Sequence, residues 1–154
     1  MNSNENARGR VLTALVLANV LLLVAQYLLG MYVNLFVQFP DSLPQGNGWS
    51  WVFSNSSATV AHIALGTAIA FLSIVVLVVS IARRRALVIT SSALGLLMVL
   101  FAWWSGSDFL SRGQRDVSSY TMAIGFVGAV VFYIWQIILL FRHGGTSKGQ
   151  AGER

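Results

Sequence analysis

The chain has 154 residues, of which 56% are hydrophobic and only 10% carry a charged side chain, and it contains no cysteine. Soluble domains carry about 25% charged residues, so this composition excludes a water-soluble globule. Without cysteine there are no disulfides, thiol nucleophiles or thiolate metal sites among these residues. The net charge of +5 is better explained by membrane topology than by binding to nucleic acid, which we do not expect as a partner.

Four apolar runs follow one another along the chain. Each is long enough to cross a bilayer, because about 20 apolar residues span a hydrocarbon core of roughly 30 Å. The predicted spans are residues 11–33, 59–82, 86–104 and 119–141. The third span is expected to end at Trp104, where the polar stretch 105–108 begins. The fold class predicted from these runs is all-α, a bundle of four transmembrane helices.

The basic residues indicate the orientation of this bundle, because Lys and Arg resist translocation. Of the ten Lys and Arg residues, only Arg112 and Arg115 fall on the side opposite the termini. We therefore expect both termini in the cytoplasm (N-in/C-in), with a segment at 1–10, a transmembrane domain at 11–142 and a tail at 143–154. The expected partner is the lipid bilayer, and the expected location is a prokaryotic plasma membrane.

The long outer segment between the first two spans is predicted to fold against the membrane surface as a cap. Trp49, Val52 and Phe53 are expected to dip into the membrane there, because amphipathic rings favour the headgroup level. Long ordered connections of this kind are often functional.

Few polar residues lie within the spans, and they are expected to join helices. By depth, Asn19 could hydrogen-bond to Gln136, and Gln26 lies close to the level of Thr67. Such bonds usually fix helix register. No Asp, Glu, Lys or Arg lies near a predicted helix centre, which argues against a proton pump, an ion-coupled carrier or a voltage sensor.

His62 is the polar residue that most needs explaining. It lies one turn inside the outer end of the second span, and Met122 lies at nearly the same depth on the fourth. His and Met are a known axial pair for haem iron, and Gly30, Gly66 and Gly125 would leave room for a porphyrin. The alternative is a structural histidine that hydrogen-bonds to a neighbouring helix, with glycines that only allow close helix packing.

Three short segments carry a family resemblance. Residues 26–33 (QYLLGMYV), the Phe-Pro at 39–40 and residues 61–66 (AHIALG) resemble one four-helix half of the haem A synthase family. The resemblance implies a four-helix bundle in which a histidine at the outer end of the second helix binds a b-type haem. His62 matches that ligand, and Gln26 and Gly30 match the pattern of the first helix.

The chain also departs from that family. No histidine stands where the family has its fourth-helix ligand, and Met122 is the nearest substitute. The acidic residue that accompanies the histidine in the catalytic half, and the cysteine pair of many members, are missing as well. We therefore do not predict hydroxylation of a haem methyl group, and we expect no catalysis by this chain on its own.

Two functional hypotheses follow. In the first, a small integral membrane protein binds one haem b near the outer face for electron transfer or haem handling. The metal ligands are then His62 and Met122, and the glycines at 30, 66 and 125 line the ring. In the second, the chain is a cofactor-free accessory or interaction subunit of a larger membrane complex or a homo-oligomer. A small-solute carrier is disfavoured because no span is charged or broken.

Overall fold

The computed structural model describes residues 3–40, 47–112 and 116–145, and these are helical or irregular with no strand. The helices are α1 (Ser3–Phe36), α2 (Gly48–Asn55), α3 (Ser57–Ala82), α4 (Ala86–Ser111) and α5 (Asp116–Gly145). All but α2 are long and apolar enough to cross a membrane. The chain is therefore an all-α, multi-pass integral membrane protein, as the sequence predicts.

Two predicted boundaries differ clearly from the structure: α1 begins at Ser3 and not at residue 11, and the end of α4 lies beyond the predicted one. The third span was expected to end at Trp104, but α4 continues to Ser111. The polar residues do not break the helix, because the Ser105 hydroxyl donates to the Phe101 carbonyl within it. Gly106 also has a role in packing, since a Cβ there would lie 3.2 Å from the Met122 sulfur of α5.

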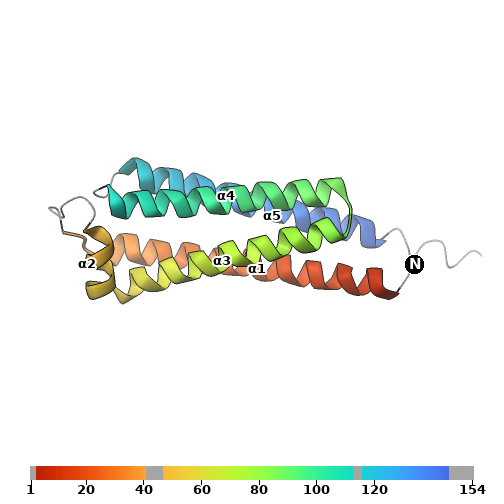
Figure 1. Cartoon of the computed structure of the whole chain (residues 1–154), viewed down its shortest axis with the longest axis horizontal. Coiled ribbons are helices and arrows are strands. Elements are labelled where there is room, and N and C mark those ends of the chain that lie inside the picture. Colours follow the sequence, from red (N-terminus) through yellow and green to blue (C-terminus); the bar gives the residue numbers. More distant parts are fainter. Residues whose placement is uncertain (1–2, 41–46, 113–115, 146–154) are drawn as a thin grey trace, which may run out of the picture.

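The four long helices form an antiparallel bundle. Contacts join α1 to α3, α3 to α4, α4 to α5 and α5 back to α1, so each helix has two neighbours. Figure 1 shows α4 and α5 running side by side above α1 and α3. The first turn of α1 and the last turn of α5 lie at the same end of the bundle.

The interior of the bundle is filled at a spacing of three or four residues. On α1 the buried positions are Leu12, Val16, Asn19 and Leu23. This alternation is the a/d pattern of left-handed helix packing, in which side chains of one helix enter gaps of the next. The bundle core is therefore a continuous seam along the helices.

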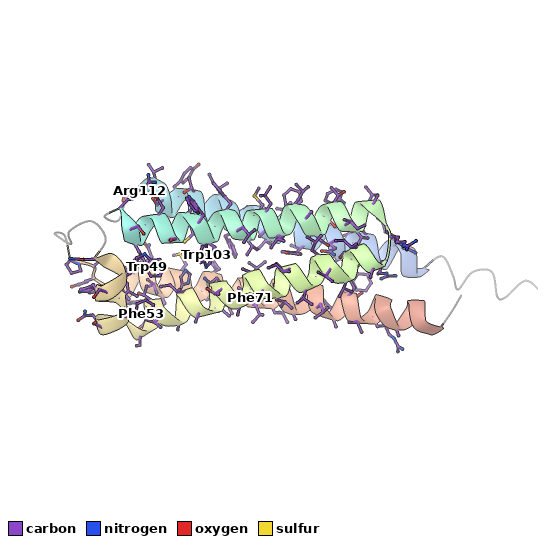
Figure 2. All side chains as sticks on the ribbon, viewed as in Figure 1. Trp49, Phe53, Phe71, Trp103 and Arg112 are labelled. Carbon is purple, nitrogen blue, oxygen red and sulfur yellow. The ribbon has the colours of Figure 1, made fainter. Side chains whose placement is uncertain are left out.

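Large apolar side chains cover the outside of the bundle. Leu21 is 70% exposed and Phe71 is 66% exposed, and Figure 2 shows Phe71 pointing away from the other helices. In water such a surface would aggregate. In a bilayer it is the surface expected, because lipid tails are as apolar as leucine.

The end of the bundle opposite the first turn of α1, called the outer end below, carries a helical cap, which refines the predicted one. Because residue 48 is a glycine, the start of α2 can lie directly against the Leu110 carbonyl of α4, where a Cβ would overlap the oxygen. The Trp49 indole donates to the Ser111 hydroxyl over 3.1 Å. Val52 is fully buried within the protein. Phe53 is 64% exposed and points outward (Figure 2), so it is the cap residue free to enter the membrane.

Candidate functional site

The imidazole of His62 lies against α1 near the outer end of the bundle. The amide nitrogen of Gln26 donates to the His62 carbonyl over 3.0 Å and lies 3.2 Å from the ring Nε2. A Cβ on Gly30 would lie only 2.8 Å from the ring Cε1. The outer edge of the ring, formed by Nε2 and Cε1, is therefore packed directly on the first helix.

The Gln26 amide nitrogen can only donate, and it donates to the His62 carbonyl. For its 3.2 Å contact with the ring to be a hydrogen bond as well, Nε2 must accept. The proton of a neutral imidazole must then be on Nδ1. Both the Nδ1 of His62 and the Oε1 of Gln26 are buried without a hydrogen-bond partner.

A reciprocal arrangement joins the same two helices. Gly30 of α1 makes room for the His62 ring of α3, and Gly66 of α3 makes room for the Gln26 amide of α1, where a Cβ would lie 2.9 Å from Nε2. We call these four residues, Gln26, Gly30, His62 and Gly66, the α1–α3 interlock. Each helix offers one glycine and one polar side chain to the other, which fixes their register.

Met122 and Gly125 belong to a different interface. The Met122 sulfur lies against Gly106 of α4, and a Cβ on Gly125 would lie 2.8 Å from the Ala102 nitrogen and 2.9 Å from the Met98 carbonyl oxygen. Both residues therefore serve the close approach of α5 to α4. Of the five residues proposed for the haem site, the structure brings together three in the α1–α3 interlock and places two between α4 and α5.

This arrangement does not fit an axial haem site. An axial nitrogen needs a free lone pair, but Nε2 of His62 accepts from Gln26 and the ring edge faces α1. Gly30, Gly66 and Gly125, which were expected to admit a porphyrin, face protein atoms instead. A metal ion held without a porphyrin is a separate case, and residues 3–40, 47–112 and 116–145 contain no group of three or more His, Cys, Asp or Glu that could bind one.

The other polar residues within the spans pair differently from the prediction. Asn19 donates to the Ser73 hydroxyl over 3.1 Å, and Gln136 donates to Ser80 over 3.1 Å and to Ser92 over 2.7 Å. The predicted Asn19–Gln136 bond is therefore replaced by bonds to serines. These serines were missed, although Ser73 and Ser80 are seven residues apart and so share one face of α3.

Gln26 likewise pairs with His62 and not with Thr67. The Thr67 hydroxyl donates to the Ile63 carbonyl over 2.9 Å and accepts from the Trp103 indole over 3.3 Å. Trp103 thereby joins α4 to α3 at the outer end, where Figure 2 shows its side chain near the space between the helix pairs.

The surface of the described residues includes an apolar hollow and a smaller polar one. One has a volume of about 480 Å³ and is apolar; its walls come from α4 and α5 and consist of Met98, Tyr120, Ala123, Ile124, Val127 and Gly128. The other has a volume of about 180 Å³ and lies at the outer end of α4, between Trp104, Ser107, Asp108, Ser111 and Arg112. Within it, Arg112 is paired with Asp108 over 2.8 Å.

Comparisons with protein-family models, curated proteins and solved structures found no match to this chain. The likeness to haem A synthase therefore remains an expectation carried by the quoted residues. Function has to be argued from the geometry of the bundle.

Proposed function

We propose that this protein is a cofactor-free membrane subunit that acts by binding another transmembrane protein. The observation that carries the proposal is the α1–α3 interlock. Its histidine and glycines are the residues best suited to a cofactor, and each of them contacts the opposite helix. Since the interior residues are used in holding the helices together, the surface is the part of the molecule left for function.

The apolar hollow between α4 and α5 is the proposed contact for a helix of the partner. Its wall includes the small, exposed Ala123 beside the bulkier Tyr120 and Ile124, whereas the space beside Gly128 is filled by the Met98 side chain. Small residues flanked by large ones let a further helix approach closely in a membrane, where packing rather than hydrophobicity drives association. The partner predicted by this chemistry is a single apolar transmembrane helix of another protein.

Photocrosslinking in native membranes tests this proposal. Ile124 lines the hollow and is 46% exposed, whereas Ile134, at 45%, is the matched control. Ten residues separate them, so their directions on α5 differ by about 80°. A benzophenone side chain at position 124 should give one discrete protein adduct that position 134 does not give. Adducts with lipid only, or equal adducts at both positions, would refute the proposed contact.

Haem b binding is the second candidate function, and the observation that favours it is that Nδ1 of His62 has no hydrogen-bond partner, so the ring is held at one of its two nitrogens only. It would require the ring to leave its contact with Gly30. An absorption spectrum of the protein purified from haem-sufficient cells decides between the two. We expect no reduced-minus-oxidised haem band; a band that is lost in His62→Ala and kept in His143→Ala would overturn the cofactor-free proposal.

We also infer that the shared end of α1 and α5 faces the cytoplasm of a prokaryotic cell. The support is the cluster of Arg83, Arg84 and Arg85 at that end of α3, because basic loops stay on the cytoplasmic side. The cysteine-free chain allows a clean test with an impermeant maleimide. Ser54→Cys on α2 should react in intact cells, and Ala86→Cys should react only after permeabilisation. The reverse pattern would overturn this orientation.

A further inference from the structure

The polar hollow at the outer end of α4 is lined by one face of that helix. Its residues are Trp104, Ser107, Asp108, Ser111 and Arg112, and their spacing of three or four residues along the helix makes them neighbours on one face. The hollow has a volume of about 180 Å³, which equals the liquid volume of about six water molecules. It is therefore large enough for a polar group of several atoms.

The length of α4 places this hollow at the level of the lipid headgroups. The helix has 26 residues, which span about 39 Å at 1.5 Å per residue, whereas the hydrocarbon core is about 30 Å thick. Because Arg85 stands outside the core at the opposite end, the core ends near Ser105. The remaining turns of α4 lie where phospholipids carry their phosphates, and the exposed Trp104 is typical of this level.

An ion pair within the hollow is held in place from α5. Asp108 accepts from the Ser118 hydroxyl of α5 at Oδ2 over 2.7 Å, and its Oδ1 lies 2.8 Å from Nε of Arg112. The carboxylate therefore fixes the guanidinium through Nε alone. The two terminal nitrogens of Arg112 have no ion pair or hydrogen bond within the part of the chain that the structure describes. The Arg112 side chain is 62% exposed and lies at the outer end of the bundle (Figure 2).

The hollow offers both donors and acceptors to a ligand. The Ser111 oxygen accepts from the Trp49 indole, so its own hydrogen remains to be donated, as do the terminal N–H groups of Arg112. A carboxylate has about four lone-pair sites, and the two contacts of Asp108 leave the others to accept. Trp104, at 66% exposure, adds an aromatic face that can attract a cation.

We propose that this hollow binds the headgroup of a phospholipid that carries both a phosphate and a primary ammonium group, as phosphatidylethanolamine does. The phosphate accepts from the terminal nitrogens of Arg112, whose planar fork matches two phosphate oxygens. The ammonium donates to the carboxylate of Asp108 and lies against the ring of Trp104. Carboxylate, guanidinium, phosphate and ammonium then alternate in charge around the site.

A headgroup with no net charge fits because the hollow itself has none. The charges of Asp108 and Arg112 cancel, so an anionic headgroup would gain the contact with Arg112 but would also meet the negative charge of Asp108. A choline headgroup has no N–H to donate to that carboxylate. A metal ion does not fit, because Asp108 is the single acidic residue in the lining and both of its oxygens already have partners.

Native mass spectrometry of the purified full chain tests this site. Phosphatidylethanolamine and phosphatidylglycerol with identical acyl chains are added at equal concentrations. We expect the ethanolamine lipid to bind about tenfold more, a difference of one charge-assisted hydrogen bond. Arg112→Gln should abolish this preference, and the control Arg85→Gln, an exposed arginine at the other end of α4, should keep it. Equal binding of the two lipids, or a preference that survives in Arg112→Gln, would overturn the proposal.

A second variant tests the role of the carboxylate. Asp108→Asn keeps the shape of the side chain but removes its charge, so it should reverse the preference in favour of phosphatidylglycerol. A retained preference for the ethanolamine lipid would overturn the assignment of the ammonium to Asp108. If this variant failed to fold, the exposed Arg112→Gln would still decide whether the hollow binds lipid.

Soluble compounds of the same chemistry identify the source of the phosphate. Phosphoethanolamine and inorganic phosphate, at the concentration used for the lipids, should give no adduct, because neither has the acyl chains that hold a lipid beside α4. Binding of either compound as strongly as the lipid would overturn the lipid as occupant. The site is separate from the apolar hollow between α4 and α5, so these results are independent of the proposed contact with a partner helix.

Discussion

The contact between Gly95 and Tyr133 gives a prediction whose size can be worked out from the structure. In Gly95→Ala, the new methyl group would lie 2.8, 3.0 and 3.1 Å from three ring carbons. Carbon atoms normally approach to about 3.5–4.0 Å, so ring and helix must separate by about 0.5–1 Å. Tyr133 is completely buried, so any shift of its ring must displace neighbouring side chains.

Overpacking of this kind costs about 1–3 kcal/mol, which raises the unfolding equilibrium constant about 5-fold to 150-fold. The assay is reversible unfolding by steric trapping in bicelles. The control is Gly106→Ala on the same helix, where the new methyl group meets only the Met122 sulfur at 3.2 Å. That atom lies near the end of a flexible side chain, which can turn aside, so this variant should lose little stability.

A double variant separates steric overlap from a general effect of alanine in the helix. In the Tyr133→Leu background the ring is gone, and Gly95→Ala should be neutral or should stabilise by up to about 1 kcal/mol, since alanine is the better helix former. The interpretation would be refuted if Gly95→Ala cost no stability in the wild-type chain. Equal costs of Gly95→Ala with and without the tyrosine ring would refute it as well.

Three further predictions concern other contacts of the bundle. Gly125→Ala should destabilise more than Gly95→Ala in the same assay, because its methyl group meets backbone atoms of Met98 and Ala102 that cannot rotate away; an equal or smaller loss would contradict this. Gln136→Leu should lower the free energy of unfolding by about 0.6–1.7 kcal/mol, because it removes the hydrogen bonds to Ser80 and Ser92. The control Gln38→Leu, on the exposed outer segment, should leave the stability unchanged. Similar losses of stability in both variants would argue against the network. Gly48→Ala should release α2 from the Leu110 carbonyl, so hydrogen exchange of the α2 backbone amides should become faster while that of α3 stays the same. Unchanged exchange rates in both helices would show that the cap does not depend on this contact.

The sequence predicts the four spans well because each is a long apolar run, and hydropathy reports this property directly. The end of α4 could not be placed in the same way. Ser105 and Gly106 are residue types that often end a helix. Here the serine hydroxyl donates to the carbonyl four residues earlier, and the glycine lets α4 pack closely against Met122. Hydropathy and turn propensity do not include either effect, so the extra residues to Ser111 were missed.

The polar interior was predicted only in part. Depth counted along each helix places Asn19 and Gln136 at comparable levels, but depth does not say which face of a helix a residue occupies. The structure shows that each amide meets serines on α3 or α4. Serine is small and common in transmembrane helices, so it carries little signal in a single sequence. The heptad spacing of Ser73 and Ser80 was the available indication.

The α1–α3 interlock explains why a packing motif and a haem motif can look alike in sequence. Both combine a histidine with glycines on neighbouring helices. In the packing motif the imidazole ring fills the space beside a glycine, whereas in the haem motif that space would be left for the porphyrin. Here Gly30 receives the His62 ring and Gly66 receives the Gln26 amide. The identity of the residues is therefore compatible with either use, and the direction of the imidazole is what distinguishes them. Because that direction depends on the hydrogen bond between Gln26 and His62, Gln26→Leu frees the ring without altering either glycine. If this variant acquired a haem band that the wild-type protein lacks, the Gln26 amide would be identified as the group that holds His62 away from a cofactor.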